Sequence, residues 1–358
     1  MGHGAQPLYN ISATFTPAAA DTAASAGAIS AHRRVGFRHF AVVTGDDTNA
    51  TYVKASEGAD GTDQTGMMWR INGAAIFSKG ANMIPMEEME GRMAANAHKQ
   101  LVQTAVDGGM NTLRVWGGGM FLPDAWYDAC DELGIMVYHD MQYAQGGHSP
   151  KNDVVQDAEL RHQIRRLSSH ASIVLWDGCN ECRVIIGTPT GVYATFVMTV
   201  VAQEDASRSI WPSCPSLGWT GGVDKLTSRP NGKPLTTPPG ARVGQPGGFL
   251  LETHGPYQHG SGWPAVNGGG KMVPVSPSMH ADMPITVPKE TGTTVGIGKP
   301  NIFASEFGSS VYSSFESMSP TLKPEHWGMH GGAGPDVCKG GFASKCEGTN
   351  TMAQRNYP

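Results

Sequence analysis

The sequence has no apolar run of the roughly 18 residues that a membrane-spanning helix needs. Its charges nearly balance, with 26 Lys and Arg against 31 Asp and Glu, and no basic cluster carries interleaved aromatic residues. We therefore expect neither a membrane span nor a nucleic-acid partner. Residues 1–7 lack the charged and apolar regions of a secretory signal, so a signal peptide is not expected within this fragment.

Cysteine is also scarce, because six residues are too few for a disulfide scaffold at 358 residues. Cys338 and Cys346 flank a Gly-rich turn and form a possible disulfide closing a short loop. Cys179 and Cys182 lack a second Cys or His pair at zinc spacing, which predicts packed thiols and no metal site. Two sequons, at Asn10 and Asn49, are possible glycosylation sites and favour a secretory compartment.

Residues 1–64 hold short β-like runs separated by small and polar residues, as in a β-sandwich. Such runs occur at 8–15, 35–43 and 51–54. A sandwich of the immunoglobulin type has about seven strands. We therefore predict part of a β-sandwich over residues 1–64, which the family resemblance described below makes immunoglobulin-like.

From residue 65 to 358, apolar strands alternate with amphipathic helices, the pattern of a parallel sheet. Strands are predicted at 76–82, 113–116, 135–140, 173–176, 211–217, 249–254 and 302–306, and helices at 86–107, from Pro123 to Gly134, at 153–168 and at 192–206. A doubly wound sheet would need a Gly-rich phosphate loop after its first strand, and none is present. We therefore predict a (β/α)8 TIM barrel that lacks its last unit, with long Gly/Pro-rich loops at 218–248 and 262–300.

Catalytic residues of such barrels lie at the carboxyl ends of the strands. Polar side chains follow the apolar runs at these places: Asn82, Arg114, Asp140, Asn180, Glu181, His254 and Glu306. Two carboxylates facing each other across the barrel mouth suit glycoside cleavage, since one protonates the leaving oxygen and the other attacks the anomeric carbon. The spacing alone leaves open a salt bridge to a neighbouring loop for either Glu181 or Glu306.

Several longer motifs resemble glycoside hydrolase family 2, and within it the β-mannosidases. Residues 175–181 (LWDGCNE) resemble the family's acid/base strand, and residues 303–308 (FASEFG) its nucleophile strand. Residues 113–119, 130–135 and 165–173 resemble other stretches of the mannosidase barrel, and residues 2–9 a linker into the sandwich. The resemblance implies a retaining, exo-acting hydrolase of terminal β-D-mannosides in glycans, without a cofactor, in a lysosomal or secreted location.

The resemblance also implies roles for individual residues. Glu181 would be the acid/base and Glu306 the nucleophile, with Arg114 holding Glu306 ionised. Asn180 would bind the sugar 2-hydroxyl, and Tyr257 would touch the nucleophile. The other predicted substrate contacts are Asn82, Trp116, Asp140, His254 and Trp263; for Trp116 and Trp263 a packing role stays open, and for Asp140 a supporting role behind the sugar contacts.

The sequence departs from the family at Met83, where Trp is usual, at Cys182 and Arg183 after the acid, and around Met141. These changes leave both carboxylates in place but make strict mannose preference uncertain. Other family 2 activities (β-galactosidase, β-glucuronidase, exo-β-glucosaminidase) and a non-catalytic carbohydrate-binding or structural descendant therefore remain alternatives. Since the family's jelly roll and last barrel unit are not represented, we expect further N- and C-terminal parts of the same protein to complete the chain.

Overall fold

The structure is a computed structural model. It describes residues 4–16, 27–44, 50, 67–87, 89–144, 150–181, 192–205, 207–211, 213–214, 252–257, 303–308, 315–324 and 327. The chain divides into two compact units, Met1–Thr253 and His254–Pro358. No helix in the described ranges has the length and apolar character required to cross a membrane.

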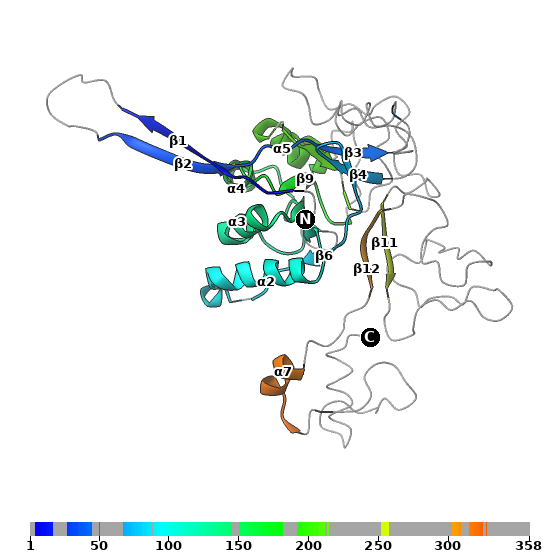
Figure 1. Cartoon of the computed structure of the whole chain (residues 1–358). Helices are drawn as coiled ribbons and strands as arrows, with labels where there is room; N and C mark the ends of the chain where they lie inside the picture. The colour runs from blue at the N-terminus through cyan, green and yellow to red at the C-terminus, as the bar shows by residue number, and fades with distance from the viewer. Residues whose placement is uncertain are drawn as a thin grey trace. The chain divides into compact units, whose positions relative to one another are not determined.

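The first unit begins with two antiparallel sheets (Figure 1). One is the ribbon of β1 (Tyr9–Phe15) and β2 (Ile29–Val35), and the other joins β3 (Phe40–Thr44), β4 (Met67–Ile71) and β5 (Ala74–Ile76). The predicted strand at 35–43 is thus two strands, and the one predicted at 51–54 lies outside the described residues.

The strand predicted at 76–82 also divides, between β5 and the first parallel strand. The cause is the two-residue turn Asn72-Gly73, in which both residues have positive φ (50° and 83°). Such turns match the twist of paired antiparallel strands, so β4 and β5 form a hairpin. The chain must leave this hairpin before it can enter the next sheet.

A five-stranded parallel sheet follows, and its strands are neighbours in the order in which they occur along the chain. They are β6 (Gly80–Met83), β7 (Thr112–Val115), β8 (Met136–Asp140), β9 (Ile173–Asp177) and β10 (Ser209–Trp211). A doubly wound sheet reverses its strand order at a switch point, whereas a barrel does not. The parallel α/β architecture is confirmed, and the strand order matches the first five strands of the predicted barrel.

Helices connect these strands: η1 (Glu90–Arg92), α2 (Ala95–Asp107), α3 (Asp124–Leu133), α4 (Val154–Leu167), η2 (Tyr193–Met198) and α5 (Thr199–Glu204). Helix α2 packs beside α3, and α4 beside α5 (Figure 1). Gly134 ends α3 in the left-handed conformation (φ 72°), as predicted. The helix predicted at 86–107 is shorter, since η1 occupies part of its first half and α2 begins only at Ala95.

The second unit contains the paired strands β11 (Glu252–Tyr257), which begins at the end of the first unit, and β12 (Phe303–Gly308). It also contains the short helices α7 (Phe315–Met318) and η3 (Ser319–Thr321). β11 and β12 correspond to the sixth and seventh predicted strands.

Candidate active site

Arg114 is the centre of a buried polar cluster at the carboxyl ends of β6 to β9. Its Nε and Nη2 atoms donate to the two carboxylate oxygens of Asp140 at 3.0 and 2.6 Å. Nη2 also donates to Oδ1 of Asn180 at 2.7 Å, and Nη1 to Oδ1 of Asn82 at 3.1 Å. Arg114, Asp140 and Asn180 are 3%, 0% and 4% exposed. Four of the predicted site residues therefore form one hydrogen-bonded group.

The period of two along each strand explains this grouping. Tyr138 and Asp140 share a face of β8, while His139 faces the opposite side and bonds Tyr127 of α3. Register places Arg114 beside Tyr138, whose ring lies 5.7 Å from the guanidinium carbon. The Tyr138 hydroxyl donates to Asp177 at the end of β9. Sequence reasoning missed the Tyr138–Asp177 pair, although alternation along each strand identifies both positions.

The glycines after β7 bring backbone close to this cluster. The amide N–H of Gly117 donates to Oδ2 of Asp140 at 2.9 Å. A Cβ at Gly117 would collide with the carbonyl oxygen of Tyr143, and one at Gly118 would collide with the ring of Trp116. Trp116 is half-buried, and its ring covers Gly118. The glycine run thus lets the backbone after β7 approach Asp140 beside Arg114.

Glu181 lies at the end of the segment after β9, in a strained backbone conformation. Its φ of 55° is in the left-handed region, which residues other than glycine rarely adopt. Its amide donates to the carbonyl oxygen of Cys214 at 2.6 Å, and the amide of Asn180 donates to that of Tyr143. These hydrogen bonds fix the backbone of both residues, so the half-buried Glu181 is held next to the buried Asn180. Strain of this kind concentrates at functional sites.

The other predicted residues fall elsewhere. His254 and Tyr257 lie in β11 and Glu306, half-buried, in β12, so these three belong to the second unit. Asn10 is exposed on β1. Trp263, Asn49, Cys338 and Cys346 lie outside the described residues.

Contacts in the structure bear on three of the sequence interpretations. Asp140 is fully buried and both of its oxygens accept hydrogen bonds, which favours its role in holding Arg114 over direct contact with a sugar hydroxyl. Arg114 forms a buried ion pair with Asp140, while its role in holding Glu306 ionised stays a prediction. Cys179 is disulfide-bonded rather than a packed thiol, while Cys130 is a buried free thiol.

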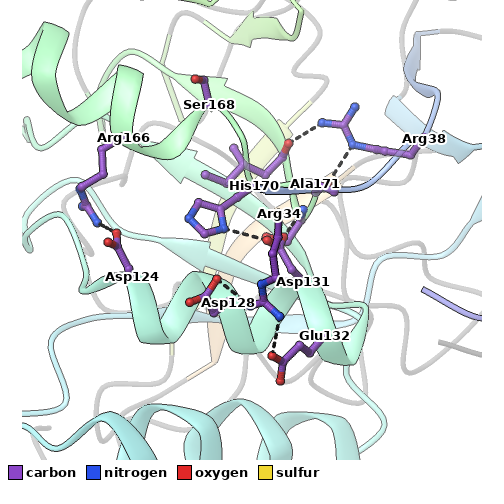
Figure 2. Close-up of polar contacts among 12 residues, drawn as sticks. Arg34, Arg38, Asp124, Asp128, Asp131, Glu132, Arg166, Ser168, His170 and Ala171 are labelled. Atoms are coloured by element: carbon purple, nitrogen blue, oxygen red, sulfur yellow. Dashed lines mark hydrogen bonds and ion pairs between the residues drawn. The ribbon is translucent and has the colours of Figure 1, made fainter. Parts of the chain in front are cut away.

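Among the described residues, one group has the composition of a cation site: Asp128, Asp131 and His170 (Figure 2). Its acidic side chains are already paired. Arg34 donates to Asp128 at 2.8 Å, and Asp131 accepts from the Ser172 amide and bonds His170, each at 2.7 Å. Each member of the group therefore has a partner within the protein, and we interpret the group as a structural cluster.

His139, next to Asp140, is a buried neutral imidazole. Because the Asp140 carbonyl oxygen can only accept, His139 Nδ1 donates to it at 2.7 Å, and Nε2 then accepts from the Tyr127 hydroxyl at 2.7 Å. Burial lowers the pKa of His139 to about 3. Below its ordinary pKa of about 6.5 the unfolded chain binds a proton that the folded chain excludes.

We expect this exclusion to make the folded protein less stable as the pH is lowered. The His139 contribution is fully present above about pH 6.5 and decreases by about 1.4 kcal/mol per pH unit down to its folded pKa. Urea unfolding at pH 7 and pH 5 should show a smaller loss in His139→Gln than in wild type. His162→Gln, at an exposed position on α4, is the control and should behave as wild type. Equal pH slopes for wild type and His139→Gln would contradict this assignment.

Comparison with known proteins finds similar sequences among curated β-mannosidases. The chain is 37% identical over 177 residues to β-mannosidase of Rattus norvegicus, covering 44% of this chain and 20% of that protein. It is 28% identical over 240 residues to β-mannosidase A of Aspergillus niger, covering 61% of this chain and 24% of that protein. It thus spans about a fifth to a quarter of the length of these curated relatives. No protein-family model matches the chain.

Among solved structures, the β-D-mannosidase from Dictyoglomus thermophilum matches with 27% identity and a TM-score of 0.45, covering 59% of this chain and 25% of that one. The exo-chitosanase of Amycolatopsis orientalis matches with 17% identity and a TM-score of 0.43, covering 62% and 24%.

Proposed function

We propose that the chain belongs to glycoside hydrolase family 2 and carries the catalytic centre of a retaining, exo-acting β-mannosidase, which its similarity to curated β-mannosidases supports. The observation that carries the proposal is Glu181. It is a half-buried carboxylate held in strained backbone directly after Asn180, whose side chain is anchored on Arg114. A carboxyl group directly after a buried strand places a proton donor at the sheet edge where barrel enzymes bind substrate.

In the proposed reaction, the Glu181 carboxyl donates its proton to the glycosidic oxygen as the bond to the sugar breaks. Glu306 attacks the anomeric carbon and forms a covalent glycosyl-enzyme. Glu181, now ionised, takes a proton from water, which attacks the same carbon and releases Glu306. This requires the two carboxyl groups to lie about 5–5.5 Å apart.

The Arg114 cluster supports this reaction through position. Asp140 balances the buried guanidinium, so Arg114 can orient Asn180 and Asn82 by hydrogen bonds without leaving an unpaired buried charge. An amide fixed in this way can bind a sugar hydroxyl with little loss of side-chain entropy. Trp116, half-buried beside it, is the proposed platform for a sugar face.

The substrate is a terminal β-mannoside of an oligosaccharide or glycan, a choice supported by the curated relatives. We also propose a lysosomal or secreted location, which the exposed sequon at Asn10 supports. Another family 2 specificity remains the second candidate, because Met83 and Cys182 depart from the family motifs.

The test is hydrolysis of nitrophenyl β-mannoside beside the corresponding β-galactoside and β-glucuronide by the full-length protein. We expect mannoside turnover that is lost in Glu306→Gln. Turnover of another glycoside with the same loss would keep the mechanism and change the specificity. A folded full-length protein that cleaves none of them would leave the non-catalytic alternative.

A further inference from the structure

A second site lies at the amino ends of β9 and β10, the sheet edge opposite Glu181. A cavity of about 520 Å³ opens there between the segment after β2 and the turns that precede the two strands. Its polar lining residues are Arg38, Asn72, Ser168, Ser169, Ser207 and Arg208. The volume is in the range of small-molecule pockets.

The two arginines in this cavity are held rigidly by backbone carbonyls. Arg38 donates from Nε to Ala171 at 2.9 Å and from Nη2 to Ile173 at 2.6 Å (Figure 2). Arg208 donates from Nε to the same carbonyl of Ile173 at 2.6 Å, and from Nη2 to His170 at 2.6 Å. Both guanidinium groups are therefore fixed in place before any ligand arrives.

The charges of the two arginines are not equally balanced. Arg208 forms an ion pair with Asp205, whose other oxygen accepts from the amide and hydroxyl of Ser207. Arg38 pairs with no carboxylate in the part of the chain that the structure describes. The nearby Asp131 bonds His170 and the Ser172 amide instead.

Arg38 is thus a half-buried cation beside a second cation. Burial, with repulsion from Arg208, lowers the pKa of Arg38 to about 10. A guanidinium without a counterion in a partly dry cavity gains most from an anion that can accept several hydrogen bonds. Ser169 adds a hydroxyl that makes no hydrogen bond to any residue in the described ranges.

We propose that this cavity binds an oxyanion, a phosphate group, either as free phosphate or on a small phosphorylated sugar. Arg38 supplies the charge, and Ser169 with Asn72 supplies further hydrogen-bonding groups on the cavity wall. Because the catalytic carboxylate Glu181 lies at the carboxyl ends of the strands, the anion would bind without occupying the glycoside site.

The experiment is isothermal titration of the full chain with inorganic phosphate and with a hexose phosphate, at constant ionic strength adjusted with chloride. We expect saturable binding of one anion per chain. Tighter binding of the hexose phosphate than of phosphate would identify a phosphorylated sugar as the ligand, and equal binding would identify free phosphate. Absence of saturable binding by both would overturn the proposal.

Two variants locate the site. Arg38→Gln should weaken binding at least about tenfold, because a charge-assisted hydrogen bond is lost. Ser169→Ala, which removes a hydroxyl that bonds no residue in the described ranges and should fold normally, should weaken it about threefold. Arg33→Gln removes an equal charge from exposed β2 outside the cavity and should bind as wild type. Unchanged affinity in folded Ser169→Ala and Arg38→Gln, or equal weakening in Arg33→Gln, would overturn the assignment.

Discussion

Replacing Glu181 with Gln is expected to lower mannoside hydrolysis about 10³-fold, in the range typical of a lost general acid–base group. The side-chain amide of Gln has nearly the same shape as the carboxyl of Glu. The backbone at φ 55° and the hydrogen bond from the residue 181 N–H to the Cys214 carbonyl oxygen should therefore persist. What disappears is the proton for the leaving oxygen, and later the base for the attacking water. Steady-state rates with alkyl and aryl mannosides measure the loss.

Varying the leaving group of the substrate and adding an external nucleophile distinguish a lost acid/base residue from general damage to the site. A dinitrophenyl mannoside needs no protonation, so its first step should survive in Glu181→Gln and the glycosyl-enzyme should accumulate. Azide needs no general base, and should therefore restore turnover with this substrate. Glu306→Gln should gain nothing from azide with a poor leaving group, because the glycosyl-enzyme is not formed.

Glu159→Gln is the matched control, since it makes the same substitution at an exposed position on α4. Its rate should equal that of wild type. Undiminished hydrolysis of alkyl mannosides by Glu181→Gln would remove Glu181 from the acid/base role.

The sequence was sufficient to predict the parallel α/β architecture and the residues at the strand ends. Buried parallel strands appear as short apolar runs, so a polar residue directly after each run is conspicuous. Asn82, Arg114, Asp140 and Asn180 were identified in this way, and the structure brings them together. Helix ends were predictable only where a local signal exists, as at Gly134.

Hydrogen-bond partners could not be predicted, because they depend on strand register and on side-chain direction. Nothing in the sequence indicated that Arg114 pairs with Asp140 on the neighbouring strand. The left-handed backbone of Glu181 gives no sequence signal, since it arises from bridges to Tyr143 and Cys214. The division of residues 76–82 was missed because the Asn72-Gly73 turn was not recognised.

The ion pair between Arg114 and Asp140 is expected to be among the most sensitive points of the fold. Asp140→Ala removes the carboxylate that pairs with a guanidinium only 3% exposed, and breaking a buried pair in this way costs about 3–5 kcal/mol. The Gly117 amide loses its acceptor at the same time, and the guanidinium that donates to Asn180 is no longer held by Asp140. Urea unfolding followed by circular dichroism measures the change in unfolding free energy.

The double variant Arg114→Met with Asp140→Ala distinguishes charge from packing. Removing the guanidinium as well takes away the buried charge that Asp140 balanced, so the double variant should be more stable than Asp140→Ala alone. Arg92→Met is the control, because Arg92 pairs with Glu87 at the surface and is 73% exposed; its cost should stay below about 1 kcal/mol. If instead the double variant were the less stable by the full cost of both single changes, the two side chains would act independently, and the cluster could not position Asn180 through Asp140.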